Sequence, residues 1–511
     1  MRRLKTAIID IGSNTIRLVL YSYDKNEGVR EFGNLKTVAR LRSCIESDGE
    51  MSEAGIQLLS NTLTAFKKVI DDYEITDIKA VATAAIRQAK NKNKIISRMK
   101  KETGLKIELL SEEEEAYFGF LAVVHSMDTP SAVTIDIGGG STEITLYSDK
   151  KLQKTYSFPF GTVSLKQNFV SGESINESER KLLRQYIKNQ FNSIPWIQNV
   201  NFPVIAIGGS ARNIAQVNQH RVDYPISGVH HYEVSKDELV GLNEFFGNMS
   251  LEQLKQLDGL SSDRADIIGI ALEVFLVLME VVGSIKFQVS KKGLREGVII
   301  NRVLQSNPEA FDKYNVFEEN AKRLAYEYGR GEEELETLAS LSDQLYRECC
   351  ELNFFELNLE DYKLIKRAAS IYAIGEYIEI DSAHQHTFYL IANQSVAGIN
   401  HKEKVKLALL ASFKNRDYFR RFATPFESWL SKEDLKKLRD FGALLKFVYA
   451  LNVSKRNIVK KIKLVKNENG IIVKLAAKKS VVAELYQAER QKKHLERIFK
   501  QPVTIQFIEK G

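Results

Sequence analysis

The stretch that decides the fold is Asp10-Ile11-Gly12-Ser13-Asn14-Thr15-Ile16-Arg17-Leu18-Val19-Leu20-Tyr21-Ser22, which returns 126 residues later as Asp136-Ile137-Gly138-Gly139-Gly140-Ser141-Thr142-Glu143-Ile144-Thr145-Leu146-Tyr147-Ser148. The two copies align without a gap, and six of the 13 positions are identical. Each copy reads as a strand, an aspartate, a glycine-rich turn and a second strand. A matched pair of this kind predicts two similar α/β halves that face each other.

The sequence around the repeat continues the α/β pattern. Apolar residues recur at helical spacing over residues 53–73, and Ser111 with Glu114 is a capping box that starts another helix. Residues 78–83 and 204–207 read as strands, and a helix is expected after the glycine pair at 208–209. Both halves therefore alternate strands with helices.

The pattern changes twice in the second part of the chain. Long helices are expected from about residue 317 to 447. Two strands follow, at 458–465 and 470–475, joined by a hairpin turn at 467–470, and then a charged helix at 481–499. We expect four domains, at 1–125, 126–303, 304–448 and 449–511.

Composition excludes several classes of protein. Of the 511 residues, 44% are hydrophobic and 27% are charged, which excludes a mainly disordered chain. The three cysteines form no disulfide framework, as expected of a cytoplasmic protein. The N-terminal apolar run is broken by Asp10, unlike a secretion signal. The most apolar later stretch, residues 267–282, contains two glutamates and is too short to span a bilayer, so we expect a buried helix and no integral membrane association.

Positive charge is concentrated at the C-terminal end. The whole chain has a net charge of +7, whereas residues 451–511 carry 15 Lys and Arg against 5 Asp and Glu, a net charge of +10. One interpretation is a solvated lysine-rich surface. The other is a track for a polyanion, with Lys460, Lys461, Lys478 and Lys479 as candidates. Nucleic acid, anionic lipid (hence peripheral membrane association) and inorganic polyphosphate all fit at this point.

The glycine-rich turns predict a phosphate site. Glycine lets backbone N–H groups approach a phosphate closely, and small hydroxyls add donors. The candidates in the turns are Ser13, Asn14, Thr15, Gly138, Gly139, Gly140, Ser141, Gly208, Gly209 and Ser210. Asp10 and Asp136 end their strands at these turns, and a carboxylate repels phosphate unless a divalent cation lies between them. The turns therefore imply Mg²⁺. A single copy of the turn would be better explained as an ordinary hairpin, whereas two matched copies favour the phosphate site.

Five blocks in order resemble the exopolyphosphatase/guanosine pentaphosphate phosphatase (Ppx/GppA) family. They are the two copies of the repeat, Ala82-Thr83-Ala84-Ala85-Ile86-Arg87-Gln88-Ala89, Ser111-Glu112-Glu113-Glu114-Glu115-Ala116 and Gly293-Leu294-Arg295-Glu296-Gly297. The resemblance implies a duplicated actin-like (ribonuclease H-like) ATPase fold. An all-α domain similar to HD phosphohydrolases and a small α+β C-terminal domain would follow, as in the long family members.

The resemblance also assigns roles to single residues. Glu115, the last glutamate before alanine, would be the general base that takes a proton from the attacking water, although acidic residues also suit any helix N-terminus. Arg87 would clamp phosphate oxygens, the alternative being a surface arginine. Arg17 lies on a strand, where an arginine needs a partner or a function. Glu143 occupies the equivalent position in the second copy and is a candidate metal ligand, with Asp136 and Asp10. Arg264 is a further phosphate candidate, or part of an ion pair at a helix end.

The helical domain departs from the HD pattern. Tyr372 and Ala373 stand where the His-Asp pair would be, and Ala411-Ser412-Phe413-Lys414 lacks the expected histidine. His384 and His386 have no carboxylate partners in the sequence pattern and are interpreted as surface or hydrogen-bonded histidines. The metal centre of the HD type is therefore expected to be lost.

The function that follows is Mg²⁺-dependent release of orthophosphate from the ends of inorganic polyphosphate. A monovalent cation such as K⁺ is a further candidate cofactor. Hydrolysis of the 5′-γ-phosphate of guanosine pentaphosphate is the first alternative, so guanosine pentaphosphate and tetraphosphate are candidate ligands. A non-catalytic polyanion- or nucleotide-binding regulator and an actin-like sugar kinase are alternatives of other classes. The resemblance suggests a homodimer in the cytoplasm that binds no nucleic acid.

Overall fold

A computed structural model describes residues 4–478 and 480–509. The chain divides into two compact units: the first runs to Val316 apart from the short segment Pro225–Ser227, and the second holds that segment and the chain from Phe317 onward. The finer boundaries expected at residues 125, 303 and 448 stay predictions.

The first unit begins with a five-stranded sheet in the order β3-β2-β1-β4-β5. Its strands are β1 (Leu4–Ile11), β2 (Thr15–Asp24), β3 (Gly28–Val38), β4 (Asp77–Ala82) and β5 (Ile107–Leu109). The first three form an antiparallel meander, whereas β4 and β5 run parallel to β1. The helical parts are η1 (Leu41–Cys44), α1 (Glu53–Asp72), α2 (Ala84–Arg87), α3 (Lys92–Thr103) and α4 (Glu112–Val124).

The second half of this unit repeats the same topology. Its sheet has the order β10-β11-β9-β6-β7-β8, formed by β6 (Ala132–Ile137), β7 (Thr142–Ser148), β8 (Lys151–Phe158), β9 (Val204–Ile207), β10 (Tyr232–Ser235) and β11 (Lys286–Val289). Strands β8-β7-β6-β9-β11 correspond one by one to β3-β2-β1-β4-β5, including which pairs are parallel. The edge strand β10 is an addition to this pattern. The duplicated α/β fold predicted from the repeat is confirmed.

The repeat also holds at the level of register and turn. Asp10 lies opposite Arg17 across β1 and β2, and Asp136 lies opposite Glu143 across β6 and β7. Within the turns, Gly12 N donates to Thr15 O at 3.0 Å, and the equivalent Gly138 N donates to Ser141 O at 2.9 Å. The gapless alignment therefore reflects the same hairpin built twice.

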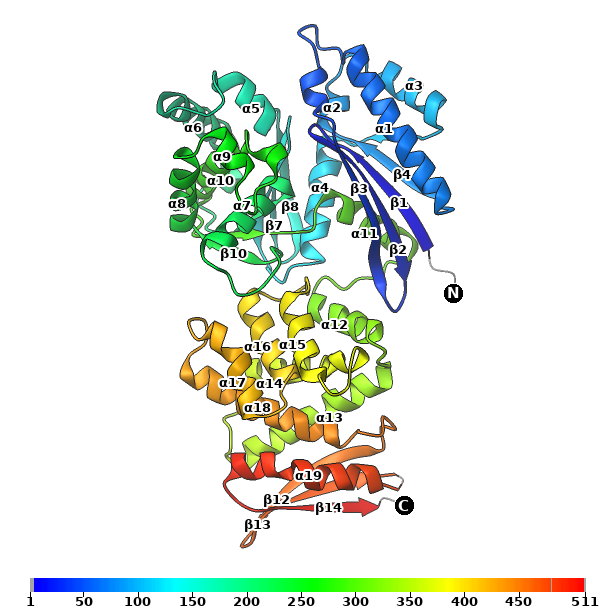
Figure 1. Ribbon diagram of the computed structural model, residues 1–511, viewed down its shortest axis with the longest axis vertical. Coiled ribbons are helices and arrows are strands. Elements are labelled where there is room, and N and C mark those ends of the chain that lie inside the picture. The colour runs from blue at the N-terminus through cyan, green and yellow to red at the C-terminus, as the bar shows by residue number, and fades with distance from the viewer. Residues whose placement is uncertain (1–3, 479, 510–511) are drawn as a thin grey trace. The chain divides into compact units, whose positions relative to one another are not determined.

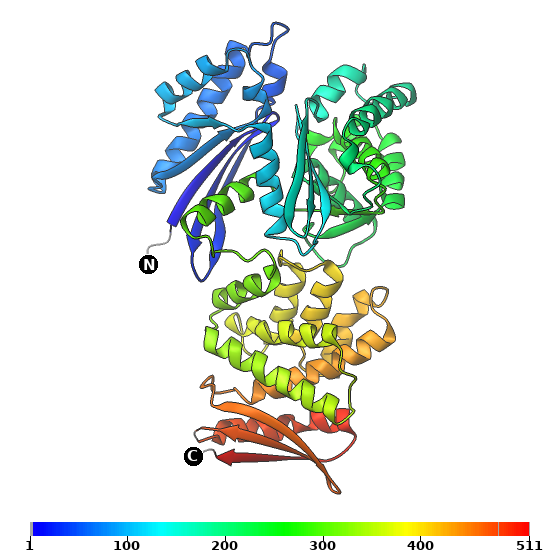
Figure 2. The same ribbon diagram turned by 180° about the vertical axis from the view of Figure 1, so that it is seen from behind.

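A pair of helices lies between the two sheets (Figures 1 and 2). They are α4 and α11 (Leu294–Ser306), which pack against each other, and α11 also contacts β1. Residues on alternate positions of β1 take part in two separate cores: Ile9 packs with α1 and α3, whereas Ile8 packs with α4 and α11. Val298 and Ile299 of α11 belong to the same core as Ile8.

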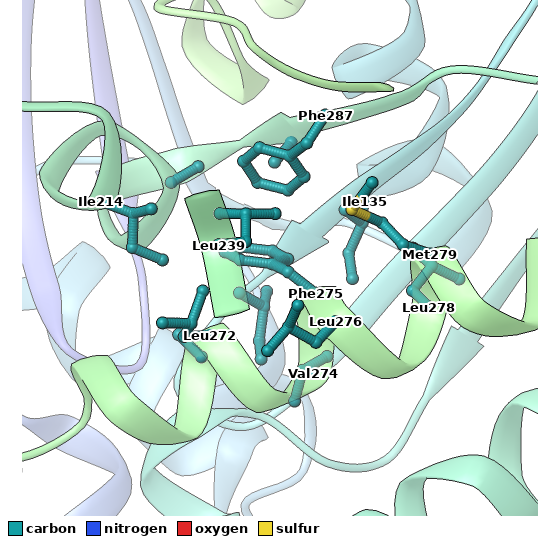
Figure 3. Close-up of a cluster of buried hydrophobic side chains, with 14 of the residues drawn as sticks. Ile135, Ile214, Leu239, Leu272, Val274, Phe275, Leu276, Leu278, Met279 and Phe287 are labelled. Carbon is teal, nitrogen blue, oxygen red and sulfur yellow. The ribbon is translucent and has the colours of Figure 1, made fainter. Parts of the chain in front are cut away.

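The outer face of the second sheet carries a large hydrophobic core (Figure 3). Its helical elements are α5 (Thr162–Phe169), α6 (Glu177–Asn192), η2 (Pro195–Ile197), α7 (Gly208–Arg221), α8 (Lys236–Gly247), α9 (Leu251–Lys255), η3 (Ser262–Arg264) and α10 (Ile268–Val282). Phe275 of α10 packs against Phe287 of β11 with their ring centroids 5.1 Å apart. The apolar stretch at 267–282 is thus a buried helix, as predicted. Among the residues described, no helix is long and apolar enough to cross a membrane.

The second unit begins with helices. They are α12 (Val316–Glu327), α13 (Glu332–Glu351), α14 (Leu359–Ser370), η4 (Ile374–Tyr377), α15 (Ala383–Asn393), α16 (His401–Ala411), α17 (Arg416–Ala423), η5 (Thr424–Phe426) and α18 (Lys432–Ala450). Tyr372, at the expected place of the lost histidine, donates from its hydroxyl to the carbonyl of Phe413 at 2.8 Å and is buried. An all-α region follows the duplicated fold, as expected.

A small sheet and one helix end the chain. Strands β12 (Val459–Asn467), β13 (Gly470–Ala477) and β14 (Val503–Glu509) form the sheet, and α19 (Val482–Phe499) connects β13 to β14. The predicted hairpin and charged helix are both present. The register of the hairpin shifts between Val459 and Lys461, and both Lys460 and Lys461 are exposed.

Candidate active site

The two repeated turns, the start of α7 and the start of α4 line one cavity of about 140 Å³ in the first unit. The predicted site residues that line it are Asp10, Ser13, Asn14, Thr15, Arg17, Glu115, Asp136, Gly138, Gly139, Ser141, Glu143, Gly208, Gly209 and Arg264. These residues come from elements up to about 250 positions apart in the sequence. The structure thus brings together nearly the whole set that was predicted for phosphate, metal and water.

Three predicted residues lie just behind this lining. Arg87 ends the short helix α2 and donates from Nη1 to a carboxylate oxygen of Glu115 at 2.9 Å. Ser210 accepts a hydrogen bond from Arg264 at 3.3 Å. Gly140 packs beside Ser13, and a β-carbon added to this glycine would lie 3.4 Å from the serine hydroxyl oxygen. They position lining residues rather than facing the cavity themselves.

Two glycines at the start of α7 are required by close contacts. Gly208 has φ of 90°, in the left-handed region, and a β-carbon there would lie 2.7 Å from a carboxylate oxygen of Asp136. At Gly209 a β-carbon would lie 2.3 Å from the guanidinium carbon of Arg264. Asp136 and Arg264 can therefore pack directly against the backbone of Gly208 and Gly209, where no side chain intervenes. Arg264 ends the short 3-10 helix η3, and α10 begins only at Ile268.

Four carboxylates gather at the cavity and repel one another. Burial raises the pKa of Asp136 to about 6 and that of Glu115 to about 7. Burial, followed by the charges of Glu115 and Asp136, holds the pKa of Glu143 well above its usual range. The pKa of Asp10 is also raised by burial, although Arg295 opposes the shift with an ion pair at 3.1 Å.

Only one of the four glutamates at the start of α4 lines the cavity. Glu114 completes the capping box with Ser111, which confirms the predicted helix start. Glu113 is exposed, and hydrogen bonds from the backbone and Ser111 lower its pKa. Glu112 is half-exposed at 49%, whereas the side chain of Glu115 is 14% exposed and lies against Arg87. The structure therefore distinguishes Glu115, which lines the cavity, from the neighbouring glutamates, which do not. The sequence alone could not make this distinction, because all four residues are glutamates.

Arginines form the other side of the cavity. Arg17, Arg212, Arg264 and Arg295 all line it. Burial lowers the pKa of Arg212 to about 10, and repulsion from Arg295 adds to that effect. Burial also lowers the pKa of Arg17 and of Arg264. A buried group of like charges of this kind favours an anion, and the planar guanidinium suits phosphate.

Several buried donors at the site have no hydrogen-bond partner among the described residues. They are Asn14 Nδ2, Arg17 Nε, Arg87 Nε and Nη2, and Arg295 Nε. A carboxylate oxygen of Glu112 lies 3.8 Å from Arg87 Nη2, beyond hydrogen-bond distance. Leaving such groups unsatisfied is costly, because each loses its hydrogen bonds to water on burial. The site therefore fits a ligand rich in acceptor oxygens.

Sequence reasoning missed two of these arginines. Arg212 lies on α7 three residues after the glycine pair, and Arg295 lies within the block Gly293–Gly297 that supported the family resemblance. A basic residue next to a phosphate-type glycine turn was the available signal for both. Arg295 is also the partner that neutralises Asp10.

Asp136 and Glu143 are the residues that fit a divalent cation. They lie directly opposite each other on antiparallel strands, where like charges destabilise the pair, and the pKa of each is raised by burial. In the first copy Arg17 takes the place of the second carboxylate, and Asp10 is already paired with Arg295. Among the described residues no group of three His, Cys, Asp or Glu side chains is arranged to hold a metal ion. Two carboxylates suit Mg²⁺, which keeps several waters and takes further oxygens from phosphates.

The remaining predicted residues lie in the second unit. Lys460, Lys461 and Lys478 are exposed, and Lys479 lies outside the described residues. His384 is only 8% exposed, with its ring centroid 4.1 Å from that of Tyr418, so of the two interpretations, surface or hydrogen-bonded, the surface one is wrong for this residue. His386 is half-buried. Ala373 adopts φ of 55° and belongs to no cluster of metal-ligating side chains in the described part of the chain.

Comparison with known families assigns most of the chain. The Ppx/GppA phosphatase family matches residues 23–306, and domain III of Ppx/GppA phosphatases matches residues 314–498. The first match contains most of the cavity lining and most of both repeated halves. The second contains the helical region and most of α19.

Individual relatives agree with this assignment. A bifunctional 3-dehydroquinate synthase/phosphatase of Fusobacterium nucleatum is 28% identical over 51% of the chain, which spans 41% of that relative. Exopolyphosphatase 1 of Mycobacterium bovis is 24% identical over 59% of the chain and 88% of its own length. A solved Ppx/GppA structure from Aquifex aeolicus covers 60% of the chain and 99% of its own, with 27% identity and a TM-score of 0.53. An exopolyphosphatase structure from Cytophaga hutchinsonii (22% identity, TM-score 0.54, 58% of this chain and 97% of its own) shares the fold.

Proposed function

Because the chain belongs to the Ppx/GppA phosphatase family, we propose that it is an exopolyphosphatase, which hydrolyses the terminal phosphate of inorganic polyphosphate. The observation that carries the proposal is the pairing of Glu115 with Arg87 at the edge of a cavity lined by two glycine turns and four arginines. The pairing with Arg87 fixes a carboxylate base at the edge of the cavity, and the four arginines that line the cavity supply positive charge for the phosphate oxygens. A hydrolase needs a base and a charged phosphate site close together.

In this mechanism the glycine turns and the hydroxyl of Ser141 hold the terminal phosphoryl group. Glu115 accepts a proton from a water molecule as its oxygen attacks the terminal phosphorus. The bond from that phosphorus to the bridging oxygen breaks, and orthophosphate leaves. The shortened chain keeps the bridging oxygen, and the negative charge that develops on it is stabilised by the arginines of the cavity.

The electrostatics of Glu115 suit this role. A general base is most effective when its pKa lies near the working pH. Burial raises the pKa of Glu115 to about 7, while Arg87 opposes the shift and holds the carboxylate in place. The hydrogen bond to Arg87 leaves the second carboxylate oxygen to meet the water.

Asp136 and Glu143 would hold Mg²⁺, with Asp10 as a weaker candidate because Arg295 already pairs with it. Mg²⁺ neutralises charge on phosphate oxygens when it is bound. The chain's own contribution is to place two carboxylates side by side on β6 and β7 in a largely buried position. K⁺ remains a further candidate cofactor, and a homodimer and a cytoplasmic location belong to the same proposal.

Guanosine pentaphosphate is the second candidate substrate, since its 5′ end presents the same linked phosphoryl groups. The excess of positive charge in residues 451–511 favours a long polyanion, with Lys460, Lys461, Lys478 and Lys479 as proposed contacts. A non-catalytic regulator would not need the buried Glu115. Hydrolysis is favoured over phosphoryl transfer because the family whose model matches the chain is a phosphatase family.

One purified preparation tests these alternatives. Long polyphosphate, short polyphosphate, guanosine pentaphosphate and ATP are each offered with Mg²⁺, and phosphate release is measured. We expect release from long polyphosphate to be fastest. Release from guanosine pentaphosphate alone would assign the second candidate, and binding without release from any substrate would assign a regulator.

A further inference from the structure

Five cations gather in the second unit without a carboxylate partner. Lys414 follows α16, Lys446 lies on α18, and Arg490, Lys493 and Arg497 lie on α19, which packs against α18 (Figure 1). None of the five forms an ion pair within the part of the chain that the structure describes. By contrast, their neighbour Lys492 pairs with Glu489 at 2.7 Å. The five side chains therefore form a local excess of positive charge, which no ion pair among the described residues neutralises.

The spacing on α19 places these groups on one face of the helix. Residues 490, 493, 494 and 497 follow the pattern i, i+3, i+4 and i+7, which defines a stripe along a helix. His494 lies within this stripe and turns toward the loop after α16, with its ring centroid 5.9 Å from that of Phe413. Lys446 donates from Nζ to the carbonyl of Lys414 at 2.5 Å. The stripe, α18 and the loop therefore meet at His494.

His494 is a buried polar side chain without a partner for its Nε2 atom among the described residues. It is 4% exposed. Burial lowers its pKa to about 4, and the charges of Lys446, Arg497 and Lys493 add to that effect. Burial likewise lowers the pKa of Lys446 to about 8, with contributions from Lys493, Lys414, Arg490 and Arg497. A bound anion would offset the repulsion among these cations.

We propose that Lys414, Lys446, Arg490, Lys493, His494 and Arg497 form a second anion site, which binds a run of linked phosphoryl groups. Arg490 and Arg497 are seven residues apart, about 10 Å along the helix. A single phosphate cannot reach both ends of that stripe, whereas a linear chain can. The inference rests on the proposed function for the identity of the chain, since polyphosphate supplies linked phosphoryl groups and its hydrolysis supplies free orthophosphate.

This cluster differs from the strand lysines proposed above. Lys460, Lys461 and Lys478 are exposed, and no buried polar group lies unsatisfied among them. The neighbouring Lys463 is already engaged by Glu348 at 2.9 Å. The α19 cluster has a half-buried lysine and a buried histidine at its centre, where electrostatic interactions are less screened by solvent. We therefore assign the main phosphoryl contacts of the second unit to α19.

The test compares two triple variants that remove equal charge from exposed positions. Arg490→Gln/Lys493→Gln/Arg497→Gln removes the stripe. Lys94→Gln/Lys100→Gln/Lys101→Gln, on α3 of the first unit, is the matched control. Binding of long polyphosphate, tripolyphosphate and orthophosphate to the full chain is measured with EDTA present and at several salt concentrations, so that turnover does not enter.

The stripe variant should bind long polyphosphate at least about tenfold more weakly at low salt, and its slope of log K against log salt should fall by about 2, because three charges no longer release counterions. The control should bind as the wild type does. Equal binding by both variants would overturn the site. Preferential loss of orthophosphate binding, with the long chain unaffected, would also overturn it, because it would mean a site for single anions.

Two further measurements separate this site from structural damage and from the proposed function. In the wild type, saturation with tripolyphosphate should raise the pH at which the His494 imidazole resonance titrates, the signal being identified by its loss in His494→Gln. An unchanged titration would place the anion elsewhere. Hydrolysis of a short polyphosphate should be the same in both triple variants. If the wild type hydrolyses no polyphosphate but the stripe still binds it, the proposed function fails and the second site stands.

Discussion

Replacing Asp136 by asparagine should stabilise the first unit in the absence of Mg²⁺. Asp136 is a buried carboxylate whose pKa is raised from 3.8 to about 6 by burial. An acid with a raised pKa in the folded state binds protons more tightly there than in the unfolded chain. Its contribution therefore becomes unfavourable as the pH rises from about 4 to 6, and it stays fully unfavourable above 6.

The size of the effect follows from the shift. A difference of roughly 2 pKa units corresponds to about 3 kcal/mol at 1.36 kcal/mol per unit. The amide of Asp136→Asn cannot ionise, so the variant should gain about this much at pH 8 and almost nothing at pH 3.5. With an unfolding entropy of about 2.1 cal/mol/K per residue over about 310 residues, the gain corresponds to a rise in Tm of about 5 °C.

The assay is thermal unfolding followed by Trp196, which lies in the first unit, in a Trp429→Phe background. Adding Mg²⁺ should stabilise the wild type and leave Asp136→Asn unmoved, because the ion binds only where the carboxylate is present. Asp72→Asn, which removes an exposed carboxylate from the same unit, is the control and should change little at either pH. If Asp136→Asn were less stable than the wild type at pH 8 without Mg²⁺, the ionised Asp136 would not destabilise the first unit, and the reasoning above would be refuted.

Three further predictions concern the reaction and its geometry. Glu115→Gln should lower kcat by about 10²–10⁴ with substrate binding largely intact, whereas Glu112→Gln should be mild; equal effects in both variants would remove the base from Glu115. The hydrolysis rate should rise with pH through the pKa of Glu115. Saturating Mg²⁺ should shift this rise to lower pH, because a nearby cation favours the ionised base. A pH profile that does not change with Mg²⁺ would contradict the placement of the cation beside Glu115. Gly209→Ala should raise KM, since its β-carbon would overlap the guanidinium of Arg264, whereas Gly269→Ala on α10, which has open space around it, should not; steady-state kinetics of the two variants decide the point.

The repeat predicted most of the fold because it carries information on both local structure and topology. The alternation of apolar residues around Asp10 and Asp136 defines strands, and the identical turns define antiparallel hairpins in the same register. Once both hairpins were aligned, a duplicated α/β architecture followed. The edge strands β3, β8 and β10 were not predicted, because many of their residues are exposed and show a weak apolar pattern.

The candidate site was predictable where local chemistry marks a residue. Glycine turns, strand-end aspartates and a glutamate before a buried helix segment all show in the sequence. Arg295 and Asp10 are 285 residues apart and come into contact only in the folded chain, so no local sequence pattern predicts their ion pair. The burial of His384 was missed for the same reason, since the aromatic ring that covers it comes from α17.

The position of α11 in the chain has a consequence for synthesis on the ribosome. The first half of the duplicated fold is translated by Val124, yet the core that contains Ile8, Val19 and Phe118 also needs Val298 and Ile299 of α11. About 180 residues separate the two, which is a delay of about 10 to 40 s at usual elongation rates. During that interval the apolar residues of the first sheet that α11 later covers stay exposed on the nascent chain. We therefore expect a chaperone to bind the nascent chain at this sheet. Arrested nascent chains that end before Leu294 should accordingly bind a chaperone more strongly than chains that extend past Ser306 and clear the exit tunnel.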